Sequence, residues 1–323
     1  MRKRSEPWER WSASKIDLLL FKCPKAFSFR YVLFIIVPIG IEKIFGGDIH
    51  RMAQKFFTLK NGYKSEKSFI GAWRHWWWKE SLEKKHKNMV KVRNPDDPEK
   101  FFAIGVNILK RFYQDNLPYR NWELPIPGVE KRFSRKFKGH RITGVKDRIQ
   151  PVGSGYVEIW DYKTGLRKPA EKELKRDIQF TFYNLDHYLE HGQNPIGMRV
   201  DHLSSGEQIS VPIRTEKDYE QLGRWLDEAT IYVKNILQPS PGKRWKDLPF
   251  LWLNPEDIER QYFSPKPGNL CNYCDYEDIC QQWHPQDSMR ELWVKRELEK
   301  IGPDPGHIQF DLPFPKRKTK SPR

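Results

Sequence analysis

The first half of the chain carries apolar residues at helical spacing. This pattern predicts helices over 14–31, from Gly46 and Gly47 onward, over 65–86 and over 98–116. Ser14 is a candidate N-cap for the first of these helices, and a start at Gly46 and Gly47 puts His50 in the first turn of the second. The apolar run 31–41 is shorter than the roughly 20 residues of a membrane span and contains Pro38, so it is expected to be a buried core segment.

After Pro127 the spacing changes to that of strands. Strands are predicted over 129–137, 140–150 and 156–163, with a turn at 153–155, and after a helix over 171–190 two more strands follow over 197–203 and 208–213. A helix over 215–236, an irregular proline-rich stretch over 239–268, a cysteine cluster, a last helix and a basic tail complete the chain. The alternation predicts an α/β domain over 1–283, followed by 284–323 as a helix and disordered basic tail.

The charge of the chain narrows the class of its partner. Lys and Arg number 58 against 42 Asp and Glu among 323 residues, a formal charge of +16. Such an excess favours a polyanion such as nucleic acid, and solubility alone is the alternative. The charged start M-R-K-R-S-E-P lacks a secretory leader, which predicts a cytoplasmic protein that is not bound to a membrane.

The four cysteines have an uneven distribution. Cys271, Cys274 and Cys280 cluster in C-N-Y-C-D-Y-E-D-I-C, and Cys23 stands alone near the N-terminus. Three clustered thiols and one distant thiol suit a four-ligand metal or iron–sulfur site. Because cytosolic thiols stay reduced, ligation is favoured over disulfides. If all four meet, the fold brings its two ends together.

A second candidate site lies in the predicted strands. Asp161 and Lys163 are two residues apart and therefore share one face of a strand, and Asp147 at the end of the preceding strand can lie beside Asp161. Two adjacent carboxylates favour a divalent cation, and a lysine beside it can orient or deprotonate a water. A surface Asp–Lys pair without function is the alternative.

Several motifs occur in a fixed order along the chain. They are C-P-K-A-F-S-F-R-Y, G-G-D-I-H, G-V-K-D-R-I, W-D-Y-K-T-G, Q-F-T-F-Y and the cysteine cluster. From about Ser12 to Cys280 this set resembles the RecB-like branch of the PD-(D/E)XK nuclease superfamily. More narrowly, it resembles the iron–sulfur members: the AddB nuclease domain and the CRISPR-associated exonucleases of spacer acquisition. The resemblance implies a restriction-endonuclease-like fold, with a small mixed sheet flanked by helices and closed by the four cysteines.

The resemblance also implies roles for individual residues. Metal ligands would be His50, Asp147, Asp161 and the backbone carbonyl of Tyr162; the catalytic set would be Lys163 with Asp147 and Asp161, supported by Gln179 and Tyr183. Glu130 lies where some relatives carry a further acidic residue. Read alone, His50 fits an ordinary half-buried histidine, and Gln179 and Tyr183 fit helix surface and core.

The cofactors and partners follow from the same resemblance. It implies a [4Fe–4S] cluster on Cys23, Cys271, Cys274 and Cys280, ahead of zinc, and Mg²⁺ or Mn²⁺ at the acidic site. Independently of the resemblance, the clustered basic residues make Arg167, Lys168 and Arg176 candidate DNA contacts, with a solvated charged face as the alternative for each. The Trp76–Trp78 triplet is a candidate for stacking on unpaired bases, with core packing expected for at least one of the three.

The expected function is metal-dependent exonuclease cleavage of DNA, with single-stranded or duplex ends as substrate, single-stranded ends preferred and 5′→3′ polarity favoured, in repair, recombination or CRISPR spacer processing. The sequence has no G-x-x-x-x-G-K-[ST] phosphate loop, so a helicase, or a CRISPR integrase, would be a separate partner. A non-catalytic DNA-binding or assembly subunit is the alternative.

Overall fold

The computed structural model describes residues 8–59, 62–120, 124, 126–236 and 263–280. Contacts between Cα atoms divide the chain into two compact units. We call 11–14 with 38–224 the sheet unit, and 1–10, 15–37 and 225–323 the cysteine unit. The predicted boundary at residue 283, the last predicted helix and the basic tail lie outside the described residues.

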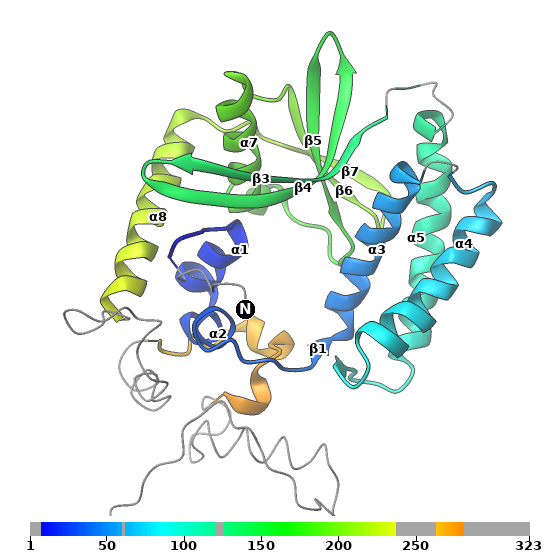
Figure 1. The fold of residues 1–323 in the computed structure, drawn as a ribbon, viewed down its shortest axis with the longest axis horizontal. Coiled ribbons are helices and arrows are strands. Elements are labelled where there is room, and N and C mark those ends of the chain that lie inside the picture. Colours follow the sequence, from blue (N-terminus) through cyan, green and yellow to red (C-terminus); the bar gives the residue numbers. More distant parts are fainter. Residues whose placement is uncertain (1–7, 60–61, 121–123, 125, 237–262, 281–323) are drawn as a thin grey trace, which may run out of the picture. The chain divides into compact units, whose positions relative to one another are not determined.

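A mixed five-stranded sheet is the centre of the sheet unit (Figure 1). Its strands, in spatial order, are β3 (Gly128–Phe137), β4 (His140–Gly153), β5 (Tyr156–Lys163), β6 (Gly197–His202) and β7 (Glu207–Val211). The first three strands pair antiparallel, β6 runs parallel to β5, and β7 runs antiparallel to β6. The predicted strands and the turn are confirmed, since Gly153, Ser154 and Gly155 all have positive φ values.

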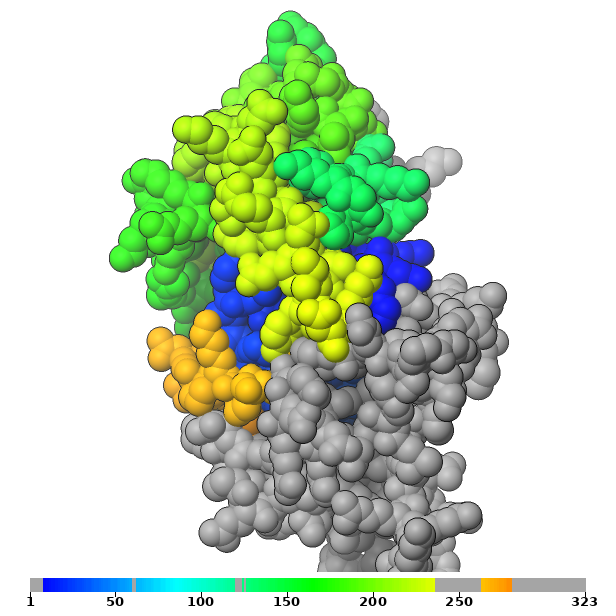
Figure 2. All heavy atoms as spheres, turned by 90° about the vertical axis from the view of Figure 1, so that its left-hand side faces the viewer, coloured from blue at the N-terminus to red at the C-terminus, as the bar shows by residue number. Residues whose placement is uncertain are grey.

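A helix lies between β5 and β6 in the sequence. It is α7 (Ile178–His191), which packs on β3 and β4. The predicted helix 171–190 is broken, because α6 (Glu171–Leu174) ends early and Asp177 caps α7 by accepting a hydrogen bond from the Gln179 backbone N–H at 2.8 Å. Helix α8 (Glu216–Ile236), yellow in Figure 2, was predicted correctly, and the boundary between the two units falls within it.

Three further helical segments of the sheet unit enclose an aromatic core. They are α3 (Ile41–Thr58), α4 (Glu66–His75) continued by η3 (Trp76–Lys85), and α5 (Asp97–Arg120). A short parallel pair, β1 (Ile39–Gly40) and β2 (Val90–Lys91), precedes α3 and α5, respectively. The expected helix start at Gly46 was wrong: α3 begins at Ile41, which places His50 in its third turn. Gly46 lies inside the helix and close to Thr164, which follows β5: a Cβ at this position would come within 3.1 Å of Thr164 Oγ1.

The N-terminal part of the cysteine unit is helical, with one interruption. Helices α1 (Ala13–Ile16, which crosses the unit boundary), η1 (Asp17–Lys22), α2 (Pro24–Phe27) and η2 (Ser28–Val32) follow one another, and Cys23 between them is extended. Two short turns, η6 (Asn269–Tyr273) and η7 (Glu277–Ile279), carry the cysteine cluster. The run 31–41 was expected to be a buried core segment, and Val32, Ile35 and Val37 are buried; Ile36 is 76% exposed because side chains of an extended segment alternate.

The apolar content of the helices bears on membrane association. Within the described ranges, no helix is both long enough and apolar enough to cross a membrane.

Candidate active site

Seven polar side chains from both halves of the sheet unit converge at one end of β5. They are His50 on α3, Glu130 on β3, Asp147 on β4, Asp161 and Lys163 on β5, and Gln179 and Tyr183 on α7. The structure therefore brings together the residues that the sequence proposed for metal binding and catalysis, with Glu130 beside them.

The strand register explains how the carboxylates of Glu130 and Asp147 become neighbours. The pairs Val129–Arg148 and Lys131–Lys146 put Glu130 opposite Asp147. Asp147 also faces β5, where its Oδ2 accepts a hydrogen bond from the Tyr162 backbone N–H at 2.8 Å. The prediction that Asp147 ends its strand was wrong, since β4 continues to Gly153. Glu130 has φ near 50°, a conformation that distorts β3 at this point.

His50, Glu130 and Asp147 form the tightest group of possible ligands. Their ligand atoms all lie within 4.8 Å of one another. His50 Nδ1 is 3.3 Å from Asp147 Oδ1 and 3.9 Å from Glu130 Oε1. On its other side, His50 Nε2 donates to the Tyr162 carbonyl at 3.1 Å. Oxygen donors with one imidazole suit Mg²⁺ or Mn²⁺, so the donor set fits a divalent cation.

Electrostatics in this group favour a bound positive charge. Burial lowers the pKa of His50, but the carboxylates of Asp147, Asp161 and Glu130 outweigh it and raise the pKa to about 9. Burial raises the pKa of Asp147, yet its pairing with His50 brings the net value below the usual range. Burial and the nearby Asp147 charge raise the pKa of Glu130. A proton on His50 thus occupies the place of positive charge that a metal would take.

Lys163 and Asp161 form the second part of the site. Lys163 Nζ lies 2.7 Å from Asp161 Oδ2 and donates to Gln179 Oε1 at 3.0 Å. Gln179 Nε2 donates to Asp161 Oδ1 at 2.8 Å, and the Tyr183 hydroxyl donates to the same oxygen at 3.3 Å. Gln179 therefore holds the carboxylate and the ammonium of the D-x-K pair in a fixed relationship.

The protonation of this pair follows from its burial. Asp161 is 1% exposed, and burial raises its pKa to about 6 even though Lys163 opposes the shift. Burial lowers the pKa of Lys163, but the Asp161 carboxylate more than compensates and raises it. Asp161 Oδ2 has the lysine ion pair but no hydrogen bond of good geometry, which leaves it able to accept a further cation.

The three residues proposed to contact DNA differ in whether an acidic side chain pairs with them. Arg167 pairs with Glu173 at 2.9 Å, and Lys168 pairs with Glu207. Arg176 is exposed in the link between α6 and α7. The charges of the first two residues are therefore partly neutralised within the protein.

Two buried contacts at this site were missed from the sequence. Lys146, next to Asp147, places its Nζ 2.6 Å from Asp186 Oδ2 on α7, and both side chains are buried. Arg214 is buried as well and donates to the carbonyls of Leu174 and Asp177, where α7 begins. The only local signal was that Asp186 lies three residues after Tyr183, on the same side of the helix.

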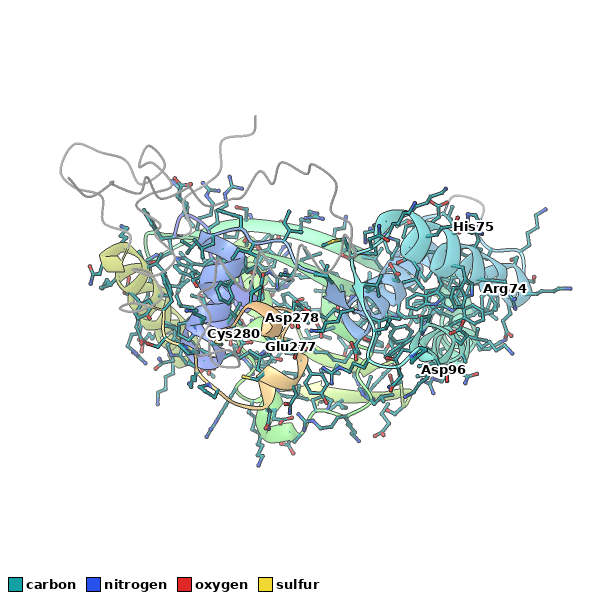
Figure 3. The ribbon with its side chains drawn as sticks, turned by 90° about the horizontal axis from the view of Figure 1, so that it is seen from below. Arg74, His75, Asp96, Glu277, Asp278 and Cys280 are labelled. Carbon is teal, nitrogen blue, oxygen red and sulfur yellow. The ribbon has the colours of Figure 1, made fainter. Side chains whose placement is uncertain are left out.

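In the cysteine unit, Cys23, Cys271, Cys274 and Cys280 line one pocket. Cys280 follows η7, whose Glu277 and Asp278 are labelled with it in Figure 3. Burial, together with nearby Cys280 and Cys23, raises the pKa of Cys274 to about 11. Phe29 and Tyr276 pack with ring centroids 5.3 Å apart, which joins the N-terminal helices to the cluster segment. Four thiols on one pocket are a donor set that fits an iron–sulfur cluster or zinc.

Solved structures similar to this one include SSO0001 and a protein of Eubacterium rectale that carries an exonuclease designation. SSO0001 has 11% identity and a TM-score of 0.35, covering 84% of this chain and 86% of its own. The Eubacterium rectale protein has 13% identity and a TM-score of 0.39, covering 84% of this chain and 95% of its own. Among curated protein sequences, no relative matches significantly.

One family model matches most of the chain. It describes the PD-(D/E)XK nuclease superfamily and matches residues 10–281, which include every side chain of the candidate site and all four cysteines. The mixed sheet flanked by helices agrees with the fold of that family. The chain belongs to the PD-(D/E)XK nuclease superfamily.

Proposed function

We propose that this chain hydrolyses DNA phosphodiester bonds with Mg²⁺ or Mn²⁺, as an exonuclease that prefers single-stranded ends and proceeds 5′→3′. The observation that supports it most is the pairing of Lys163 with Asp161, 2.7 Å apart, beside the His50–Glu130–Asp147 group. A family scaffold that only binds DNA would not need this buried, mutually hydrogen-bonded set.

Each residue has a distinct task in the proposed reaction. His50, Asp147, Asp161 and the Tyr162 carbonyl would hold the cation, and Glu130 is a further candidate ligand because its carboxylate is within 4.8 Å of His50 and Asp147. A divalent cation there would supply Lewis-acid stabilisation of the charge that develops on the phosphoryl oxygens. Gln179 and Tyr183 orient Asp161 through hydrogen bonds.

The surroundings of Lys163 bear on its two proposed roles, orienting the water or deprotonating it. The Asp161 carboxylate raises the pKa of Lys163, which favours the protonated ammonium. A protonated Lys163 would donate hydrogen bonds that orient the attacking water and stabilise negative charge, and this supports the orienting role.

The second proposed cofactor is a [4Fe–4S] cluster on the four cysteines. The four thiols line one pocket, which supports a shared metal group but suits zinc as well. The resemblance of the motif set to the iron–sulfur nucleases favours the cluster, and its proposed role is to join the two segments of the cysteine unit.

The cellular setting is proposed from the same resemblance. The enzyme would act in the cytoplasm, in DNA repair, recombination or CRISPR spacer processing, with a helicase or an integrase as a separate partner. The formal charge of +16 supports a polyanionic substrate.

The test is a nuclease assay on single-stranded DNA labelled at either end, with Mn²⁺ and anaerobically purified protein. We expect wild-type cleavage that is abolished by chelator and by Lys163→Ala, and retained by Lys110→Ala, which changes an exposed lysine on α5. The two end labels report the polarity of cleavage. If both wild type and Lys163→Ala bind DNA equally and neither cuts it, the non-catalytic binding subunit is the correct function.

A further inference from the structure

Two positive side chains of α3 lie over one indole ring next to the candidate active site. The Arg51 guanidinium carbon is 4.5 Å and the Lys55 Nζ is 4.4 Å from the centroid of the Trp76 ring. Such contacts hold a cation in place on the face of an aromatic ring. We call Arg51, Lys55 and Trp76 the Trp76 cation pair.

Neither cation of the Trp76 cation pair forms an ion pair within 4 Å in the part of the chain that the structure describes. Since both lie within 4.5 Å of one ring centroid, they are closer to each other than a Debye length of about 10 Å at 0.1 M salt. The nearest acidic influence on Lys55 is Glu80, whose Oε1 is held by Lys84 at 2.6 Å and His75 at 3.5 Å. His75 ends α4, as labelled in Figure 3. Two like charges held together by the fold favour an external anion.

The Trp76 cation pair is directly connected to the metal-binding group. Arg51 follows His50 in the sequence, so it is attached to α3 one residue from a candidate metal ligand. Lys55 lies one turn further along α3, so the two cations lead away from the His50–Glu130–Asp147 group along this helix. Arg51 is exposed and Lys55 is half-buried, which leaves both accessible to an anion.

We propose that the Trp76 cation pair binds the phosphodiester backbone of the single strand whose end enters the active site. This proposal rests on the proposed function, because it assigns the path of that substrate. It also changes the expected role of the tryptophan triplet. Trp77 is fully buried and donates to the Pro98 carbonyl, and the Trp76 ring is covered by cations, so these rings support phosphate binding and core packing in place of base stacking.

Two of the other candidate DNA contacts are less suited to the same task. Arg167 and Lys168 each pair with a glutamate. A phosphate would have to replace those partners, whereas at the Trp76 cation pair it would relieve repulsion.

The test is the binding of a fluorescein-labelled oligothymidylate in the presence of EDTA, measured by anisotropy over a range of KCl concentrations. Each phosphate contact with a single strand contributes about −0.7 to the slope of log K against log salt. We expect Arg51→Gln/Lys55→Gln to weaken binding and to reduce the slope by about 1.4. The matched control is Lys67→Gln/Lys110→Gln, which removes two exposed lysines of α4 and α5 and the same total charge. We expect it to keep the wild-type slope.

Two outcomes would overturn the proposal. One is an unchanged slope in Arg51→Gln/Lys55→Gln when circular dichroism shows a folded protein, and the other is an equal loss in the control. Trp76→Phe should bind nearly as the wild type and Trp76→Leu less well, because only the first keeps an aromatic face. The nuclease assay separates the two proposals: DNA cleavage with an unchanged slope refutes only the strand path, and slope loss without any wild-type cleavage refutes only the enzyme function.

Discussion

His50 Nδ1 lies 3.3 Å from Asp147 Oδ1, and this contact joins α3 to the middle of the sheet. Neither residue indicates a metal site by itself, since one is a histidine on a helix and the other an aspartate on a strand. Their proximity, with the Tyr162 carbonyl 3.1 Å from His50 Nε2, produces a site with one nitrogen and several oxygen donors.

We therefore expect Asp147→Asn to lower the affinity for Mn²⁺ by at least about 100-fold, since loss of groups that only support a ligand already costs 10–100-fold. Glu130→Gln should have a smaller effect, because its carboxylate is 3.9 Å from His50. Isothermal titration calorimetry would measure the Mn²⁺ affinity of both variants. The control is Asp96→Asn, which changes an exposed aspartate labelled in Figure 3. Equal affinities for Asp147→Asn and the control would place the metal elsewhere.

Gln179 contacts both members of the D-x-K pair, and Tyr183 contacts only one of them. Gln179→Ala should lower kcat by about 10–100-fold, because Asp161 and Lys163 both lose a hydrogen bond that orients them. Tyr183→Phe should lower kcat by less than about 10-fold, since its bond to Asp161 is 3.3 Å long and Gln179 remains. Steady-state kinetics would test this, with Tyr188→Phe on the exposed side of α7 as the control. A larger loss for Tyr183→Phe than for Gln179→Ala would contradict it.

The strand pattern predicted the central part of this site well. Alternation placed Asp161 and Lys163 on one face, and the meander of β3, β4 and β5 brings Asp147 next to Asp161 through local hairpins. Both hairpins are short, so sequence proximity and register determine these neighbours. The proposed gathering of Cys23 with the C-terminal cysteines also agrees with their common pocket.

The features of the fold that the sequence did not predict depend on contacts between residues far apart in the chain. The glycines in α3 resemble a helix start, yet the helix begins at Ile41, and Gly46 lies inside it close to Thr164, far along the chain. The contacts of the consecutive residues Lys146, Asp147 and Arg148 were equally unpredictable from the local sequence. Lys146 pairs with α7, Asp147 contacts α3, and Arg148 stacks 4.7 Å from the ring of Tyr119 on α5. Strand periodicity assigns two faces, whereas the contacts of these three residues go to three different helices.

The Lys146–Asp186 ion pair is buried and connects β4 to α7. Removing only Asp186, as in Asp186→Leu, leaves a buried ammonium without a partner and should cost about 3–5 kcal/mol of unfolding free energy. Arg135, the other partner of Asp186, is 34% exposed and can be hydrated instead. Lys146→Met/Asp186→Leu should be more stable than the sum of the two single changes predicts. Urea unfolding of the four proteins forms a double-mutant cycle, and additive free energies would refute the coupling.

The cofactor of the cysteine unit can be tested without reference to nuclease activity. Protein purified anaerobically should contain about four irons per chain and absorb broadly in the visible range. Cys23→Ser and Cys274→Ser should lose this absorbance and unfold at a lower temperature, because cluster binding contributes folding energy. Tyr273→Phe, between two of the ligands, should retain the iron. Stoichiometric zinc without iron in the wild-type protein would refute the cluster and identify a zinc site.

The stability of the sheet unit should depend on pH through His187. This α7 residue is 6% exposed, its ring lies 4.4 Å from that of His191, and burial together with the His191 and Lys146 charges lowers its pKa to about 4. In the unfolded chain its pKa is about 6.5, so the unfolded state binds the proton first. The contribution of His187 to the free energy of unfolding should therefore be fully present above about pH 6.5 and fall as the pH decreases toward 4.

His187→Gln should reduce this acid sensitivity, whereas His75→Gln, which changes an exposed histidine at the end of α4, should not. Urea midpoints measured at neutral and acidic pH would decide: parallel losses in wild type and His187→Gln would show that other groups cause the acid sensitivity.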